Sequence, residues 1–209
     1  MKTILTLFLS IILGASVQAQ SGNMMSFAVN IDDNIAGKIS IMSSGDKGRV
    51  QSSLNGHAQT FLEDQSTSKR TYLYTTETKE RIAIPTDYTD YSFLTNLNFT
   101  PTSSEVTEET QNIGGFNCKK VIVHSAEGID AHVWVTSEIS GNYQAFRNLI
   151  GTVEGSPVKI TIFGSQKLEV IMVNHSAQDL AEARFTVPNG VRTIAAEERT
   201  TYMNKIMNE

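Results

Sequence analysis

Apolar and polar residues alternate in short runs along most of the chain, and turn-forming residues separate the runs. In residues 37–42 the side chains of Ile39 and Ile41 fall on one face of an extended segment, as in a half-buried strand. Asn55-Gly56 is a strong signal for a two-residue hairpin turn. The pattern predicts an antiparallel meander of short strands that ends at Pro85.

The second half of the chain carries apolar-rich runs that predict two further hairpins. The predicted strand pairs are 116–124 with 131–136, around the turn at 125–128, and 158–163 with 168–173, around the turn at 164–166. A last strand is predicted at 183–187, because Pro188-Asn189-Gly190 then stops it. Residues 98–110 are rich in Thr, Ser and Glu and are predicted to form a polar loop.

Three segments have the features of helices. Residues 142–150 place four apolar side chains on one helical face, Tyr143, Phe146, Leu149 and Ile150. Gly151 follows at the position of a C-cap. A short helix is also predicted at 87–97, and residues 193–209 are predicted to form a C-terminal tail helix with a thin apolar face.

The first nineteen residues have the organisation of a secretory signal peptide. Lys2 supplies a positive charge, an apolar run extends from Ile4 to Leu13, and small residues lead up to Ala19. The run is shorter than the ~20 residues that a transmembrane helix needs. We therefore expect cleavage before Gln20 and an exported protein, periplasmic or extracellular. The nearest cysteine is Cys118, so we expect no lipid anchor at the new N-terminus.

Composition and charge narrow the classes of partner. The chain has 209 residues, of which 40% are hydrophobic and 19% charged, as expected for one globular domain with a real core. The formal net charge is -5, and no basic cluster interrupts the acidic balance. Nucleic acid is a poor candidate partner, because neutralising phosphates supplies most of that affinity. An anionic membrane surface is disfavoured for the same reason.

The residues that could carry chemistry do not form a recognised catalytic motif. A cluster of Cys118, His124 and His132 across one hairpin is conceivable, but ordinary strand positions explain these residues better. Asp32-Asp33-Asn34 resembles the start of a calcium loop, yet Ser43 stands where the bidentate glutamate is needed. Nucleophile motifs such as G-x-S-x-G and H-E-x-x-H are missing from the sequence. We expect no enzyme activity, no metal site and no cofactor.

Two stretches resemble known families. The first is Ile113–Lys120 (I-G-G-F-N-C-K-K) followed by Val133-Trp134-Val135-Thr136. Together with the turn Gly45–Arg49, it resembles an uncharacterised family of secreted bacterial proteins that carries only a "domain of unknown function" label. The second is Phe185-Thr186-Val187-Pro188-Asn189-Gly190, which is similar to the end of the outer-membrane lipoprotein carrier fold. That fold is an open, strongly curved antiparallel sheet wrapped around helices.

The resemblance covers most of residues 37–191 and completes the predicted fold. We expect a mainly β (α+β) protein with a single curved antiparallel sheet, an open half-barrel, and one or two helices on its concave side. The predicted divisions are a signal peptide at 1–19, a single β-rich domain at 20–192 and the tail helix at 193–209. The long N-terminal amphipathic helix of the carriers is not evident before Phe27.

The carrier-like resemblance implies a concave apolar surface that holds a lipid or an acyl chain. The candidate ligand-binding residues are Ile122, Trp134, Phe146, Ile160, Ile162, Val170 and Met172. The leading hypothesis is a non-catalytic envelope protein that binds an apolar ligand. The alternative is a protein–protein interaction module that uses an exposed sheet edge or the acidic segment 98–111, and a hydrolase is the third hypothesis.

Overall fold

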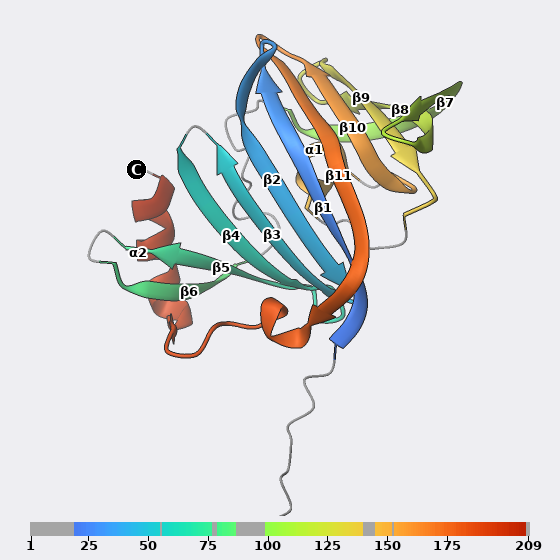
Figure 1. Cartoon of the computed structure of the whole chain (residues 1–209). Helices are drawn as coiled ribbons and strands as arrows, with labels where there is room; N and C mark the ends of the chain where they lie inside the picture. Colours follow the sequence, from blue (N-terminus) through green and yellow to red (C-terminus); the bar gives the residue numbers. More distant parts are fainter. Residues whose placement is uncertain are drawn as a thin grey trace, which may run out of the picture.

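A single sheet dominates the protein. The computed structural model describes residues 19–54, 56–76, 79–86, 99–139, 145–151 and 153–207, and within them twelve strands form one sheet (Figure 1). The strands are β1 Ala19–Ile31, β2 Asn34–Ser44, β3 Lys47–Leu54, β4 His57–Asp64, β5 Lys69–Thr75, β6 Arg81–Thr86, β7 Pro101–Ile113, β8 Phe116–Ser125, β9 Asp130–Thr136, β10 Ser156–Phe163, β11 Lys167–Ala181 and β12 Arg192–Thr193. The described helices are α1 Arg147–Ile150, a 3-10 helix at Glu182–Phe185, and α2 Ala196–Met207.

The sheet is open and almost entirely antiparallel. Its spatial order is β12-β6-β5-β4-β3-β2-β1-β11-β10-β9-β8-β7, so that β12 and β7 are its two edges. The first six strands form the predicted meander, and β8–β9 and β10–β11 are the two predicted hairpins. The two halves join where β1 pairs with β11 along its whole length. In the described residues, the short contact of β12 with β6 is the one parallel pair.

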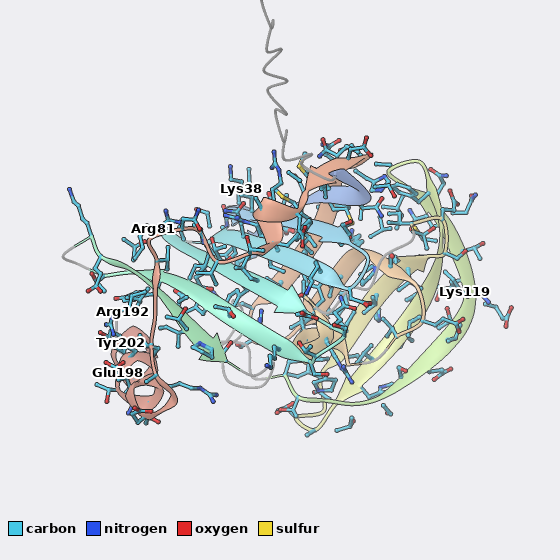
Figure 2. The ribbon with its side chains drawn as sticks, turned by 90° about the horizontal axis from the view of Figure 1, so that it is seen from below. Lys38, Arg81, Lys119, Arg192, Glu198 and Tyr202 are labelled. Atoms are coloured by element: carbon cyan, nitrogen blue, oxygen red, sulfur yellow. The ribbon has the colours of Figure 1, made fainter. Side chains whose placement is uncertain are left out.

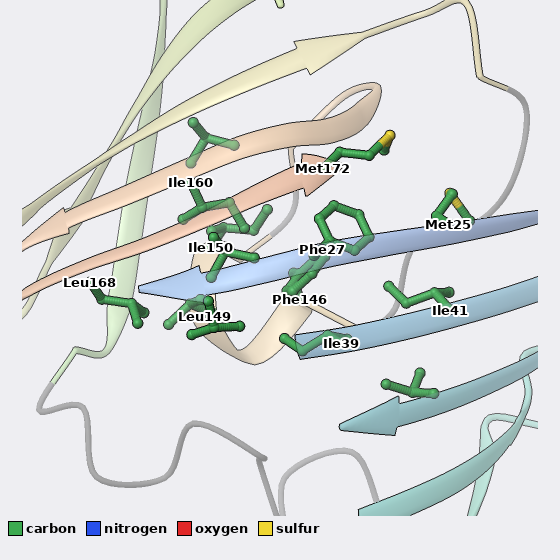
Figure 3. Close-up of a cluster of buried hydrophobic side chains, with 14 of the residues drawn as sticks. Met25, Phe27, Ile39, Ile41, Phe146, Leu149, Ile150, Ile160, Leu168 and Met172 are labelled. Carbon is green, nitrogen blue, oxygen red and sulfur yellow. The ribbon is translucent and has the colours of Figure 1, made fainter. Parts of the chain in front are cut away.

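Two rows of cross-strand neighbours define what we call the inner face of the sheet. Partners in register share a face, and alternate residues of a strand return to it. One row runs through β1–β6 as Met25, Ile41, Val50, Phe61, Tyr72 and Ile84. The other crosses β1 and β11–β8 as Val29, Val170, Ile160, Val133 and Val121. All these side chains are buried, and Figure 3 shows the part of this core around β1 and β11.

The helix α1 packs its apolar side chains into the same core. Phe146, Leu149 and Ile150 are buried, and the Phe146 ring meets Phe27 edge-on with centroids 5.1 Å apart (Figure 3). The helix covers Arg147–Ile150 and is therefore shorter than the predicted 142–150, whose residues 142–144 lie outside the described part. Gly151, with φ of 65°, ends it. The predicted helix at 87–97 also lies outside the described residues.

The predicted strand at 183–187 is wrong. The strand β11 runs on to Ala181, and a 3-10 helix follows at Glu182–Phe185. This helix contacts β3, where Arg49 Nη1 donates to the carbonyl oxygen of Arg184 at 3.1 Å. Arg49 alternates with the inner-face Val50, so the contact lies on the outer face of the sheet. Phe185 is buried there, outside the main core.

The predicted loop at 98–110 is also wrong, because most of it is the edge strand β7. Its side chains are exposed on both faces, and its register with β8 shifts between Val106 and Thr110. A strand at the edge of a sheet, with most of its side chains exposed, needs no apolar alternation, and polar residues and bulges are common there. The sequence pattern of β7 therefore carries no strand signal.

The C-terminal helix α2 is attached to the opposite edge by Arg192. Its guanidinium lies 3.3 Å from Glu80 Oε1 and 3.4 Å from Glu198 Oε2, and its Nη2 donates to the Tyr202 hydroxyl at 2.9 Å (Figure 2). The shared arginine joins β12, the start of β6 and α2.

Within the described residues, the helices are too short or too polar to cross a membrane.

Candidate functional site

The seven candidate ligand-binding residues lie on both faces of the sheet. Ile160, Ile162, Val170 and Met172 belong to the inner-face core, together with Phe146, the N-cap residue of α1. Ile122 and Trp134 point to the outer face and are half-buried, because Val121, Val123, Val133 and Val135 occupy the inner positions of β8 and β9. The structure therefore brings five of the seven together. Their role in binding stays a prediction.

The outer-face environment of Trp134 is charged. In register with it stand Lys120 on β8 and Lys159 on β10. Each lysine has an acidic partner: Lys120 Nζ lies 3.0 Å from Glu109 Oε1, and Lys159 Nζ lies 2.8 Å from Glu169 Oε2. Such ion pairs favour a hydrated surface over an apolar ligand site.

The apolar inner face is filled in this structure. The side chains of Phe27, Ile160 and Val170 are at most 1% exposed, and Phe146 is equally buried against them. An apolar ligand could reach them only if part of the covering layer moved. The α1 helix is the described element that packs there.

A row of polar residues crosses the same inner face beside the apolar row of β1–β6. We call it the polar row; its members stand in register on β2–β6 as Ser43, Gly48, Glu63, Arg70 and Thr86. Each lies two positions from a member of the apolar row, so both rows face the same side. Glu63 and Arg70 are at most 4% exposed. Fully buried charges are rare in proteins, which makes this row the most unusual feature of the inner face.

The geometry of the charged pair is loose. Arg70 Nε lies 3.4 Å from Glu63 Oε1, and the Arg70 guanidinium carbon lies 3.9 Å from the centre of the Phe61 ring. Burial raises the pKa of Glu63 above its ordinary value, and the positive charge of Arg70 opposes that rise. The site therefore favours the neutral form of Glu63 more than water does, while Arg70 stays charged.

Several polar atoms of the row lack hydrogen bonds. Among the described residues, Ser43 Oγ, Glu63 Oε1 and Thr86 Oγ1 have no hydrogen-bond partner although they are buried. Gly48 leaves the space that Glu63 occupies, since a Cβ at position 48 would lie 3.2 Å from Glu63 Oε2. Buried donors and acceptors without partners are costly, and a functional site is one place where they persist.

The polar row is not among the features predicted from the sequence, because Glu63 and Arg70 flank a run of polar residues. A usable signal was present. Glu63 lies two residues after Phe61, and Arg70 lies two residues before Tyr72, so both charges share the strand face of a buried aromatic residue. A hairpin at Asp64–Lys69 then places them opposite each other.

The cysteine and histidine candidates do not form a metal site. Among the described residues, no group of three or more His, Cys, Asp and Glu side chains could hold a metal ion. His124 Nδ1 lies 2.8 Å from Asp130 Oδ1, whereas the His132 ring packs edge-on against Phe163. Cys118 lines a depression of about 260 Å³ between β7 and β8.

We expect the Cys118 thiol to react slowly with a maleimide in the native protein and quickly in denaturant. Its side chain is buried, and burial raises the pKa of the thiol, so that little of the reactive thiolate forms at neutral pH. Mass spectrometry of timed labelling reactions measures both rates. Rapid native labelling, or a disulfide-linked dimer, would contradict this expectation.

Comparisons with known proteins show the family and the fold. The model of a domain of unknown function, DUF4412, matches residues 22–156. No curated protein matches the chain. A structure described as PNGF-II aligns with a TM-score of 0.60 and 13% identity over 88% of this chain, which spans only 33% of that protein. MucB aligns with a TM-score of 0.48 and 10% identity, covering 87% of this chain and 62% of MucB.

A putative outer-membrane lipoprotein-sorting protein domain from Vibrio parahaemolyticus is also among the similar structures. Its TM-score is 0.34 at 9% identity, with 90% of this chain and 91% of that chain covered. These likenesses concern the arrangement of the backbone. The resemblance to a family of unknown function, predicted from Ile113–Lys120 and Val133–Thr136, is confirmed.

Proposed function

We propose that this chain, which belongs to the DUF4412 family of domains of unknown function, is a non-catalytic envelope protein that binds the acyl chain of an amphiphile against the inner face of its sheet. The two apolar rows and α1 support this proposal. They form a continuous apolar surface over ten neighbouring strands, from β6 to β8.

The observation that carries the proposal is the way in which α1 covers that surface. The helix has four residues and no side-chain hydrogen bond at its N-cap. A helix this short is not stable by itself, so its place depends on the burial of Phe146, Leu149 and Ile150. These three side chains give α1 its apolar contacts with the core, and an acyl chain offers the same kind of contact. We therefore place α1 on the concave side as a lid that a ligand replaces.

Binding of this kind depends on how often the lid is open. The apparent dissociation constant equals the intrinsic one divided by the fraction of open protein. A change that weakens the closed lid must therefore tighten binding, provided that the sheet itself stays intact. A filled, permanently closed core would behave in the opposite way, since the same change would only reduce stability.

We expect Phe146→Ala to bind a fluorescent fatty acid at least about tenfold more tightly than the wild-type protein does. The substitution removes the ring that packs on Phe27 and so destabilises the closed lid. Titration of the delipidated protein, followed through energy transfer from Trp134, measures the affinity. Trp134 lies on the outer face, so it reports the ligand without contacting it.

The matched control is Phe185→Ala. Phe185 is a buried phenylalanine too, but it lies on the outer face, outside the main core. Its loss should lower stability and leave the affinity for the fatty acid unchanged. Equal or weaker binding by Phe146→Ala, or an absence of saturable binding by either protein at micromolar concentration, would remove the lipid-binding proposal.

The free edge of β7 supports a second candidate function, a protein-interaction module. Thirteen residues of this strand form one edge of the sheet, and they include Glu105, Glu108 and Glu109 but no lysine or arginine. An extended basic segment of another protein could add to that edge as a further strand. If the titration shows no binding of the fatty acid, the interaction module becomes the leading candidate function.

Export belongs to the proposal as well. Support comes from the residue pattern of positions 1–19, of which 1–18 lie outside the described part of the structure.

A further inference from the structure

We infer that the polar row receives the anionic head group of the bound amphiphile, with Arg70 as its counter-ion and Glu63 as the carboxylate that it displaces. This inference rests on the proposed function and names the class of ligand, an acyl chain with a carboxylate or similar acidic head. It follows from the position, the charge and the unsatisfied atoms of the row.

The position fits an amphiphile. The polar row lies next to the apolar row of β1–β6 on the same face. An acyl chain that lies along Ile41, Val50 and Phe61 would therefore bring its head group to Arg70. From β1, where α1 packs, to β5, which carries Arg70, there are four strand spacings, or about 19 Å along the sheet. That distance is on the scale of a long acyl chain.

The charge fits an acid. Arginine does not lose its proton in proteins, whereas a buried carboxyl group tends to gain one. Among the described residues, Arg70 of β5 is the charged group that faces Glu63, since β3 presents Gly48 and β6 presents Thr86. The neighbouring Lys47–Asp64 pair alternates onto the other face.

The exchange balances in protons and charge. Where Glu63 is ionised in the free protein, it neutralises Arg70. When the carboxylate of the ligand takes the place of the Glu63 carboxylate beside Arg70, Glu63 takes up one proton from water and becomes neutral. The hydroxyl groups of Ser43 and Thr86, which lack partners, can then donate to the ligand oxygens. The net charge at the row is zero before and after binding.

Uptake of a proton makes binding depend on pH. Where free Glu63 is ionised, the affinity for an acidic amphiphile should rise as the pH falls, by up to about tenfold per pH unit. The affinity for a neutral ester of the same chain should not change in this way, because an ester does not need the counter-ion. The pair of ligands therefore separates head-group recognition from burial of the chain.

The experiment compares a fluorescent fatty acid with its methyl ester on the full chain between about pH 8 and about pH 6, a range in which a monomeric fatty acid stays ionised. For the wild-type protein we expect the acid to bind at least about tenfold more tightly at the lower pH, and the ester to bind equally at both. Glu63→Gln, which imitates the neutral side chain, should bind the acid tightly at both pH values.

The control is Glu169→Gln, which removes the acidic partner of Lys159 on the outer face. It should keep the pH dependence of the wild-type protein. If acid and ester bind alike, with no effect of pH, the head-group inference is wrong while the proposed function stands. If neither ligand binds, the proposed function fails. The comparison of acid and ester on the wild-type protein tests the inference even if Glu63→Gln does not fold.

Discussion

Replacing Arg70 with leucine is expected to lower the free energy of unfolding by about 3–5 kcal/mol at neutral pH. The substitution leaves Glu63 buried without its counter-ion, and the unpaired charge, more than the lost attraction, accounts for most of the effect. It also removes the guanidinium that lies over the Phe61 ring. Urea unfolding followed by circular dichroism measures the loss.

The pH dependence of the Arg70→Leu variant identifies the cause. Burial raises the pKa of Glu63 in the folded protein, so its contribution favours folding at low pH and is lost as the pH rises through the folded-state pKa. Without Arg70 that pKa rises further, and part of the lost stability should return as the pH falls below neutral. The double variant Glu63→Met with Arg70→Leu should recover much of the loss at neutral pH. A loss that is the same at every pH would mean that packing, not the buried charge, is responsible.

Replacing Gly37 with alanine is expected to lower the free energy of unfolding by roughly 3 kcal/mol. A Cβ at this position would collide with the backbone carbonyl oxygen of Ser53 and lie 2.9 Å from Leu54 Cα. Both atoms belong to the main chain of β3, so the collision is relieved only if the pairing of β2 with β3 shifts.

Gly45→Ala is the matched control for Gly37→Ala. Gly45 has φ of 54°, and no atom lies within 4 Å of the position of its missing Cβ. Its replacement costs only the backbone conformation, about 1–2 kcal/mol. Thermal unfolding of the two variants gives the comparison, and equal losses would show that the close approach of β3 to Gly37 does not decide the stability.

The sequence predicted the parts of this fold that local chemistry determines. The turns around Gly45 and Gly56, and those at residues 125–128 and 164–166, all join paired strands. The residues that determine a turn lie within the turn itself, so a single sequence is enough to predict it. The open, mainly β sheet is confirmed, and the model of the family of unknown function matches residues 22–156.

The parts that failed depend on contacts between distant segments. The strand β7 was read as a loop, because an edge strand with two exposed faces shows no apolar alternation. The sequence pattern does not decide the face of Trp134, because β9 carries apolar residues at both odd and even positions, and only the neighbours on β8 and β10 decide which side is the core. The continuation of β11 through Asn174 and His175 depends on β1, which pairs with both.

Composition and turn rules do not predict the buried pair of Glu63 and Arg70. Each residue alone is an ordinary charge beside a hairpin turn. Their burial follows from the register of five strands, which places the pair beside Phe61 and Tyr72. The candidate site therefore depends on the pairing of several strands and not on any one segment of the sequence.

The pairing of β1 with β11 also constrains how the protein folds. Both strands lie in the middle of the sheet, yet they come from opposite ends of the described chain. The meander β1–β6 can form early from local hairpins, but its central edge stays open until β11 arrives, and closing so long a loop is slow. During that interval β1 offers an unpaired apolar strand to other chains. The vulnerable stage of this protein is thus its assembly, when a second copy of β1 or a chaperone can compete for the place of β11.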